Sequence, residues 1–468
     1  MVTFGKVKTG QVFTPPALVK IILDYAGYDG VGIQRRHVID NSCGNGAFLT
    51  EIVRRYCKLF LEKKSDLGLL KTELETYVHG IEIERKTFER CLVCLDAVSS
   101  EFGLTNVRWD VRCGDALKIS DYDGKMDFVV GNPPYVRVHD LSDYEATKRY
   151  EFAKKGMTDL FIVFFEIGFK MLAHEGIMCL ITPSSWLTSN AGSVLRQYVR
   201  AERNMCGLID LGHYQAFDAT TYTLISRFRK GERFDEAEYF TFDGRTHLVG
   251  TLPLDDIEIN GRFYLATRNQ LATLRKIFSH SGKKKAVVKN GFATLADKVF
   301  VGDFKFDGCV IDVVKGSSGR WTRCVFPYDE NAQPYDIETI YERFPAVYEH
   351  LNAHKAILMH RDAESSQWHL FGRSQAIKDV YSEKFAVNSI IRDVPSIKLN
   401  RVRSGQGVYS GLYILTAETE KEIKKILISD EFVEYVKTLK HYKSGGYYTF
   451  SSKEIEIFLN YKLTDKNE

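Results

Sequence analysis

The stretch Val38-Ile39-Asp40-Asn41-Ser42-Cys43-Gly44-Asn45-Gly46-Ala47-Phe48 joins a short apolar strand, a tight loop with two glycines and the start of a helix. Glycine adopts a positive φ and lets the backbone approach a ligand closely, so Gly44 and Gly46 indicate a turn beside a bound molecule. Over residues 47–64, apolar side chains recur every three or four positions, as in an amphipathic helix. The stretch therefore predicts the first strand–loop–helix unit of an α/β fold.

The same alternation continues through the first half of the chain. Further buried strands are expected at residues 77–83, 107–113, 126–130, 176–181, 207–211 and 223–228, with helices at 85–98 and 159–172. Strands that alternate with helices form an open parallel sheet with helices on both faces. We expect a Rossmann-like α/β domain over residues 1–250. Beyond it the alternation weakens, and residues 251–468 are expected to form a second, α+β domain.

The composition is that of a globular chain. Its 468 residues exceed one ordinary domain, and 44% of them are hydrophobic and 27% charged. The longest apolar run, residues 161–165, is far shorter than the roughly 18 apolar residues of a membrane span. The N-terminus lacks the apolar core of a signal peptide. We therefore expect a cytoplasmic protein that contacts no membrane, and a net charge of +3 permits a nucleic-acid partner without requiring one.

The nine cysteines do not predict a metal site. They are scattered, and the closely spaced pair Cys91 and Cys94 has no second pair or nearby histidines at ligand spacing. We expect no bound metal, and we expect both thiols to be buried or partly buried on a helix.

Acidic residues and glycines follow three consecutive strands of the expected sheet. The first strand leads into the loop at 40–46, the second ends at Glu82 and the third at Asp115. Ligands in open α/β sheets bind beyond the carboxyl ends of the strands. There Glu82 can accept hydrogen bonds from both hydroxyls of a ribose, and Asp115 can accept one from an adenine amino group. Either carboxylate can instead cap a helix or lie in a solvated loop. From the loop, the residues expected to contact a cofactor are Asp40, Ser42, Gly44 and Gly46.

The loop disfavours a phosphate-bearing cofactor. Gly44-Asn45-Gly46 lacks the third glycine of the G-x-G-x-x-G fingerprint, and the sequence contains no G-x-x-x-x-G-K-[ST] loop. S-adenosylmethionine carries a positive sulfonium, which carboxylates suit better than phosphate-binding lysines do. We therefore expect S-adenosylmethionine as the cofactor.

The fourth strand runs into the tetrapeptide Asn132-Pro133-Pro134-Tyr135. An exocyclic amino nitrogen of adenine is a poor nucleophile because its lone pair is delocalised into the ring. The side-chain oxygen of Asn132 and the carbonyl of Pro133 can each accept one amino hydrogen, which localises that lone pair and stabilises the charge that develops on nitrogen. Pro134 fixes its own φ and holds Pro133 extended. Tyr135 supplies an aromatic face for stacking on a base flipped out of a duplex.

These motifs, in this order, resemble the gamma-class adenine-N6 DNA methyltransferases of type II restriction–modification systems. The segment at 10–16 is similar to the family's N-terminal motif, which implies that Thr14 and Pro15 contact the cofactor. The loop at 40–48 is similar to its Gly-rich motif, although Asn41 stands where the family has Pro. The resemblance implies that the cofactor site also includes Ile83, Ala116, Asn132 and Phe164. For Phe161 and Phe165 of the same helix, we expect a place in the core.

The resemblance also extends to the substrate. It implies that Phe217 lies on the opposite face of the flipped base from Tyr135, although this loop lacks the family's Pro after the Phe. The C-terminal part is similar to target-recognition domains, on the segments 325–328, 368–375 and 445–450. The residues that we expect to face DNA there are Arg361, Trp368, Arg373 and Lys443. The implied activity is site-specific, adenine-specific DNA methylation, EC 2.1.1.72.

Alternative functions use the same chemistry. Methyltransferases of ribosomal RNA or of protein glutamine amides also contain Asn-Pro-Pro-Tyr, but the segment Thr14-Pro15-Pro16 and some 200 residues after the catalytic domain favour DNA. A methyltransferase of cytosine N4 is usually indicated by Ser or Asp at the position of Asn132. No proline is followed by Asp, which argues against a Pro-Asp…Glu-x-Lys nuclease in the same chain, and a binding module without catalysis is expected to lack Asn132 or Glu82. We expect double-stranded DNA as partner, a separately acting cognate endonuclease, and a monomer on DNA.

Overall fold

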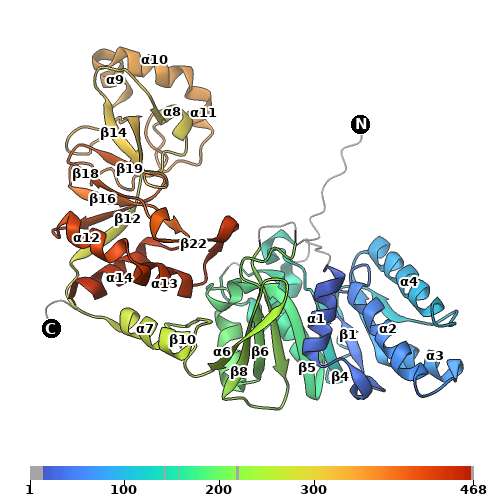
Figure 1. Ribbon diagram of the computed structural model, residues 1–468. Coiled ribbons are helices and arrows are strands. Elements are labelled where there is room, and N and C mark those ends of the chain that lie inside the picture. The colour runs from blue at the N-terminus through green and yellow to red at the C-terminus, as the bar shows by residue number, and fades with distance from the viewer. Residues whose placement is uncertain (1–13, 142–143, 157, 218–220, 465–468) are drawn as a thin grey trace. The chain divides into compact units, whose positions relative to one another are not determined.

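The structure is a computed structural model that describes residues 14–141, 144–156, 158–217 and 221–464. It consists of two compact units, one ending at Leu271 and the other beginning at Ala272 (Figure 1). The division falls within α7 (Arg268–Ser279). Residue 250, the expected boundary, lies in β9 (Thr246–Pro253), which is still part of the sheet of the first unit.

The first unit contains a nine-stranded sheet with the strand order β3-β2-β1-β4-β5-β7-β6-β8-β9. Before β9, its strands are β1 (Val38–Asp40), β2 (Val78–Glu82), β3 (Asp110–Cys113), β4 (Met126–Gly131), β5 (Leu172–Pro183), β6 (Met205–Asp210), β7 (Thr223–Arg229) and β8 (Glu236–Phe242). The first five strands pair in parallel, and each coincides with an apolar segment of the sequence. The α/β fold is therefore confirmed.

The sheet is mixed, whereas a wholly parallel sheet was expected. β7 lies antiparallel between β5 and β6, and β9 pairs antiparallel with β8. The described residues of the connection from β6 to β7, 211–217 and 221–222, contain no crossover helix, and without one the chain returns in the antiparallel direction. Because both neighbours of β7 are antiparallel to it, β5 and β6 still run in the same direction. The carboxyl ends of β1, β2, β3, β4, β5 and β6 consequently lie at the same end of the sheet.

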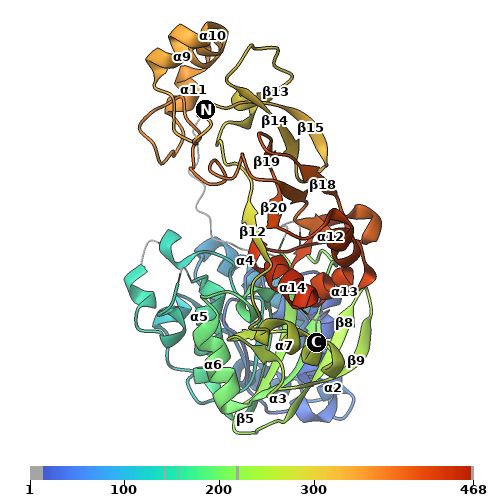
Figure 2. The ribbon, with the colours of Figure 1, turned by 90° about the vertical axis from the view of Figure 1, so that its left-hand side faces the viewer.

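Helices cover both faces of this sheet. On one face, α1 (Pro16–Ala26), α2 (Ala47–Leu61), α3 (Leu67–Tyr77) and α4 (Arg85–Ser100) share a hydrophobic core with strand residues such as Val130. On the other face lie α5 (Leu160–Met171) and α6 (Ser193–Glu202), both visible in Figure 2. There Phe165 packs edge-to-face on Phe228 with ring centroids 5.8 Å apart. Phe161 and Phe165 are fully buried, which confirms their expected place in the core.

The second unit is built from three small sheets and short helices. Its sheets have the orders β12-β20-β16-β18, β13-β15-β14-β19 and β17-β22-β21. The strands are β12 (Ala286–Asn290), β13 (Val301–Gly302), β14 (Val310–Lys315), β15 (Arg320–Val325), β16 (Lys384–Val387), β17 (Ile390–Ile391), β18 (Leu399–Val402), β19 (Gly407–Tyr409), β20 (Leu412–Thr416), β21 (Tyr442–Lys443) and β22 (Tyr447–Thr449). The helices are α8 (Asp297–Phe300), α9 (Ile337–Arg343), α10 (Pro345–Ala353), α11 (Lys355–Met359), α12 (Glu420–Leu427), α13 (Asp430–Thr438) and α14 (Ser452–Thr464). A core rich in phenylalanine, including Phe292, Phe300, Phe326 and Phe371, supports this unit.

The closely spaced cysteines lie on α4, where Cys91 is buried and Cys94 partly buried, as expected. Among the described residues, no three metal-ligating side chains form a cluster. Within the same residues, none of the helices has the length and apolarity to cross a bilayer.

The glycine loop turns sharply between β1 and α2. Gly44 and Gly46 have φ values of 54° and 85°, in the left-handed region that favours glycine. The Gly46 N–H donates to the Cys43 carbonyl at 2.8 Å, and Gly46 precedes the first residue of α2. A Cβ at Gly46 would lie 2.8 Å from the Sγ of Cys91, so α4 packs directly against this loop.

We predict that Gly46→Ala destabilises the first unit by more than Gly27→Ala does. Both positions have similar φ values, 85° and 75°, so the backbone cost of about 1–2 kcal/mol is common to both. A Cβ at Gly27 meets nothing within 4 Å, whereas the one at Gly46 collides with Cys91 and adds roughly 1–3 kcal/mol of overpacking. Urea unfolding followed by circular dichroism measures the difference, and equal losses in the two variants would contradict the predicted contact.

Candidate functional site

Polar side chains gather where strand order reverses, between β1 and β4. In an open α/β sheet the connections of two such neighbouring strands leave in opposite directions, which opens a crevice at their carboxyl ends. Asp40 ends β1, Glu82 ends β2 and Gly131 ends β4, and these strands lie side by side. The structure thus brings the glycine loop, Glu82 and the start of the tetrapeptide to one place.

The carboxylate of Glu82 fastens the glycine loop to the end of β2. Its Oε2 accepts the Gly44 N–H at 3.0 Å, and its Oε1 accepts the Glu84 N–H at 2.8 Å. Glu82 is 5% exposed. Both of its carboxylate oxygens therefore hold backbone N–H groups at the carboxyl end of β2.

Asp40 is a buried carboxyl group beneath the loop. Only 1% of it is exposed, and burial raises its pKa from 3.8 to about 7, while the hydrogen bond from the Ser42 N–H at 3.1 Å opposes the shift and the charge of Glu82 adds to it. A Cβ at Gly131 would lie 2.7 Å from the Oδ1 of Asp40, so β4 leaves room for this carboxyl only because it ends in glycine. A negative charge here is costly unless a cation lies nearby.

Asn132 is held from two sides. Its Nδ2 donates to the Oγ1 of Thr14 at 3.2 Å, and its backbone carbonyl accepts the hydroxyl of Ser42 at 3.4 Å. Thr14 precedes Pro15, the N-cap of α1, and Ser42 belongs to the glycine loop. Because the amide nitrogen is directed at Thr14, the amide oxygen points elsewhere. Two other segments of the chain thus orient the first residue of the tetrapeptide.

Tyr135 and Phe217 meet at the same edge of the sheet. Their ring centroids are 6.1 Å apart with an interplanar angle of 80°, an edge-to-face contact. The Tyr135 hydroxyl donates to the Ile181 carbonyl at 3.3 Å, and burial raises the pKa of this hydroxyl well above its usual value. The two predicted aromatics are therefore neighbours, although the loop after β6 carries one of them and the loop after β4 the other.

The remaining predicted cofactor residues have varied surroundings. Asp115 caps a short helical turn by accepting the Leu117 N–H at 3.0 Å, the alternative that the sequence left open for it. Ala116 and Phe164 are buried at 5% exposure each, while Ile83 is 63% exposed directly after β2. Residues 10–13 of the N-terminal motif and residues 218–220 after Phe217 lie outside the described residues.

Two contributors to the site have weak signals in the sequence. Asn41 is 1% exposed, and its Nδ2 contacts the sulfur of Met171 at 3.9 Å across the sheet end. The sequence shows that Asn41 replaces the proline of the family motif, but it does not predict the contact with Met171. The Ile181 carbonyl that holds Tyr135 is a backbone group of β5, and a backbone acceptor leaves no trace in residue identity.

The two arginines that were expected to face DNA in the second unit are engaged within the protein. The guanidinium of Arg361 donates to the carbonyls of Leu358, Thr294, Trp368 and Leu370, so it fastens loops together. Arg373 pairs with Asp362 at 3.1 Å and with Glu364 at 3.8 Å. Side chains engaged in this way cannot read a base without breaking these bonds.

Trp368 and Lys443 differ from the two arginines. Trp368 is partly buried against the phenylalanine-rich core, with the ammonium of Lys355 5.1 Å from its ring. Lys443 is exposed in β21 and is accessible to a ligand.

A protein-family model matches part of the chain. Residues 52–217 match the model of the Eco57I restriction-modification methylase. The matched segment begins after the glycine loop and includes Glu82, the tetrapeptide at 132–135 and Phe217.

Individual relatives extend the similarity. The chain is 28% identical over 336 residues to the type II methyltransferase M.PaeR7I of Pseudomonas aeruginosa, covering 63% of this chain and 57% of that one. It is 22% identical over 478 residues to the type II restriction enzyme and methyltransferase RM.Eco57I of Escherichia coli, covering 79% and 48%. The chain spans about half the length of the curated relatives it matches.

A solved structure has a similar fold. The type IIL restriction-modification enzyme MmeI, determined in complex with DNA, matches with a TM-score of 0.67 at 15% identity, over 93% of this chain and 63% of that one. The residues at the carboxyl ends of these strands also fit a sulfonium cofactor, since the buried carboxyl group of Asp40 gains from a nearby positive charge. This chain is a relative of the methyltransferases of type II restriction–modification systems, and its cofactor is S-adenosylmethionine.

Proposed function

We propose that this protein is a site-specific DNA methyltransferase that methylates the N6 amino group of an adenine flipped out of duplex DNA, within a restriction–modification system. The observation that carries the proposal is the tetrapeptide 132–135 at the carboxyl end of β4, beside the glycine loop and held by Thr14 and Ser42. The names of the type II methyltransferases and the DNA complex of MmeI support DNA as the substrate. We also propose a separately acting endonuclease and a monomer on DNA.

The tetrapeptide supplies two acceptors for an amino group. The Asn132 Oδ1 and the Pro133 carbonyl each accept one N–H, so that the nitrogen lone pair is directed out of the base plane as it attacks. S-adenosylmethionine supplies the electrophilic methyl group on its sulfonium. Fixed acceptors stabilise the charge that develops on nitrogen without reorganising during the reaction. Thr14 contributes by fixing the amide of Asn132 before the substrate arrives.

Capture of the base changes the aromatic pair. A base sandwiched between two rings needs both rings parallel to it, whereas Tyr135 and Phe217 are at 80° and in contact. Tyr135 is anchored through its hydroxyl to the Ile181 carbonyl, so Phe217 is the ring that must turn. Stacking is worth about 1–3 kcal/mol per base, comparable to the cost of unstacking the adenine from the duplex.

We predict that Asn132→Ala lowers the methylation rate by at least about 100- to 1,000-fold, because one of the two fixed acceptors is lost. Binding of DNA and of S-adenosylmethionine should change little. Transfer of a tritiated methyl group from the cofactor into duplex DNA measures the rate, and Asn352→Ala, at an exposed position of α10, serves as the control. A near-normal rate for Asn132→Ala would refute the role given to this residue. Methylation of ribosomal RNA or of a polypeptide, but of no duplex, would refute DNA as the substrate.

We predict that Thr14→Val lowers kcat roughly 3- to 10-fold, since one hydrogen bond of about 0.5–1.5 kcal/mol orients Asn132. Valine keeps the shape of threonine without the hydroxyl. Thr14→Ser retains the acceptor and should restore kcat. Steady-state kinetics with duplex DNA tests this, and a change confined to the KM for S-adenosylmethionine would assign Thr14 to the cofactor alone.

We predict that Asp40→Asn removes a pH-dependent loss of stability. The pKa of Asp40 rises from 3.8 to about 7 on folding, so between these values the folded chain keeps a proton that the unfolded chain has released. The free energy of unfolding therefore falls as the pH rises toward 7, by up to roughly 4 kcal/mol. Without cofactor, Asp40→Asn should match wild type near pH 4 and exceed it at pH 8 in urea unfolding. Parallel pH profiles for the two proteins would show that Asp40 carries no such shift.

A further inference from the structure

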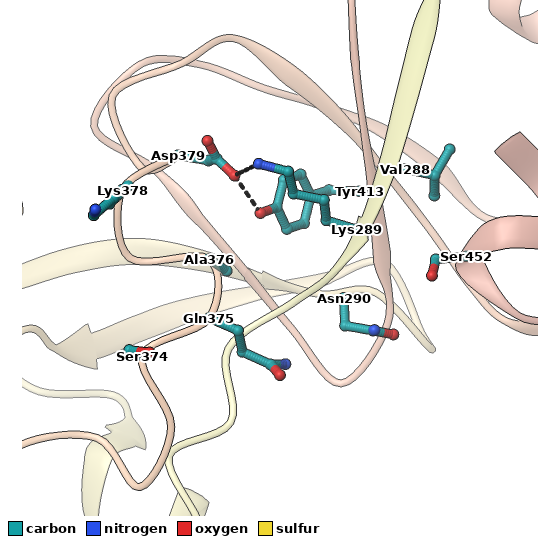
Figure 3. A pocket seen from close by; sticks show the side chains of 10 residues that line it. All are labelled: Val288, Lys289, Asn290, Ser374, Gln375, Ala376, Lys378, Asp379, Tyr413 and Ser452. Carbon is teal, nitrogen blue, oxygen red and sulfur yellow. Dashed lines mark hydrogen bonds and ion pairs between the residues drawn. The ribbon is translucent and has the colours of Figure 1, made fainter. Parts of the chain in front are cut away.

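A polar pocket opens in the second unit, next to a segment that the sequence singled out. Its volume is about 490 Å³, and Figure 3 shows the side chains around it. It lies between the end of β12, residues 374–379 and β20, and is lined by Val288, Lys289, Asn290, Ser374, Gln375, Ala376, Lys378, Asp379, Tyr413 and Ser452. Most of these side chains carry hydrogen-bonding groups, which suits a polar ligand.

The wall of the pocket is fixed by one carboxylate and one buried ammonium. Asp379 accepts the ammonium of Lys289 at 2.8 Å and the hydroxyl of Tyr413 at 2.6 Å. Lys384, 3% exposed, donates to the carbonyls of Asp379, Val380 and Ser382. These bonds stabilise the turn that follows Gln375 and Lys378. The charge of Lys289 is neutralised by Asp379.

Gln375 has the donor and acceptor that an adenine edge requires. Its side chain is exposed, and one Nε2 hydrogen donates to the Gly291 carbonyl at 2.6 Å, which fixes the plane of the amide. The second Nε2 hydrogen and Oε1 stay available. Adenine presents an N7 acceptor and an N6 donor in the major groove, and glutamine pairs with both at once. The amide of Asn290 projects from the neighbouring strand end (Figure 3).

Lys378 supplies the free positive charge. It is exposed and forms no ion pair with any of the residues that the structure describes, in contrast to Lys289. Figure 3 shows it pointing away from the pair formed by Lys289 and Asp379. A lysine beside a base-reading amide is suited to a phosphate of the same duplex, since phosphate contacts position a protein while base contacts specify the sequence.

We propose that this pocket is a duplex-DNA contact in which Gln375 recognises the major-groove edge of an adenine and Lys378 binds a backbone phosphate. The inference rests on the proposed function and assigns sequence reading to residues other than Arg361 and Arg373, whose guanidinium groups are engaged within the protein. The two side chains have different roles in this proposal. Gln375 determines which sequence is methylated, whereas Lys378 determines how tightly any duplex is bound.

The test uses the full chain, S-adenosylmethionine and a library of randomised duplexes whose methylated sites are read by sequencing. Gln375→Ala should relax the preference for adenine at one position by roughly 5- to 150-fold and leave the other positions unchanged. Gln375→Glu loses the donor to N7 and accepts from the amino group of cytosine, so preference at that position should shift from adenine toward cytosine. This second variant keeps the side-chain length. Both variants lose the donor to the Gly291 carbonyl, so their melting temperatures are compared with that of wild type to separate a change of specificity from a loss of stability.

Lys378→Gln should leave the methylated motif unchanged and weaken binding to all duplexes alike. The slope of log affinity against log salt concentration should fall by about 0.9, the value for one lost phosphate contact. Controls are Lys421→Gln and Gln367→Ala, exposed residues of the same unit outside the pocket. If wild type methylates a defined motif and the Gln375 and Lys378 variants behave like the controls, the pocket is not a DNA contact and the proposed function stands. If wild type modifies no duplex, the proposed function itself fails, and this inference with it.

Discussion

The hydrogen bond from the Gly44 N–H to the Glu82 carboxylate, 3.0 Å long, is the contact on which the site depends. It joins the loop after β1 to the end of β2, and the same carboxylate also holds the backbone of Glu84. The loop so fixed places Ser42 against the carbonyl of Asn132 and Asp40 beneath Gly131. Each later part of the site is therefore positioned through a short backbone segment whose shape only glycine at residues 44 and 46 permits.

Asp40 and Asn132 contribute to the site in different ways, one through its charge and the other through the direction of its hydrogen-bonding groups. Asp40 is buried, so an ionised carboxyl there raises the energy of the cofactor-free protein, and a cation beside it lowers that energy again. Asn132 is neutral and acts through the direction of its amide, which Thr14 fixes. Asp40 thus favours a positively charged ligand, whereas Asn132 favours a ligand with a matching hydrogen-bonding pattern.

The sequence predicted the parts of the fold that local patterns encode. The pattern of apolar residues predicted β1 to β7. Glycines predicted the loop after β1, and the two prolines of the tetrapeptide predicted the loop after β4. Helix α3 was not among the expected helices. The reversal of β7 could not be predicted either, because strand direction depends on which neighbour a strand pairs with. In the second unit, the bond from Arg361 to the Thr294 carbonyl could not be predicted, because no motif connects residues so far apart in the sequence.

The reversed strand has a consequence for how the loop that carries Phe217 can vary. Because β7 starts at the end of the sheet where β6 finishes, Asp210 and Thr223 lie at the same end of the sheet. A parallel strand in that position would have required the chain to cross to the opposite end. On the proposed function, insertions or deletions between these two residues would change the contact with the flipped base while the strands stay intact, so substrate fit and fold stability can evolve separately here.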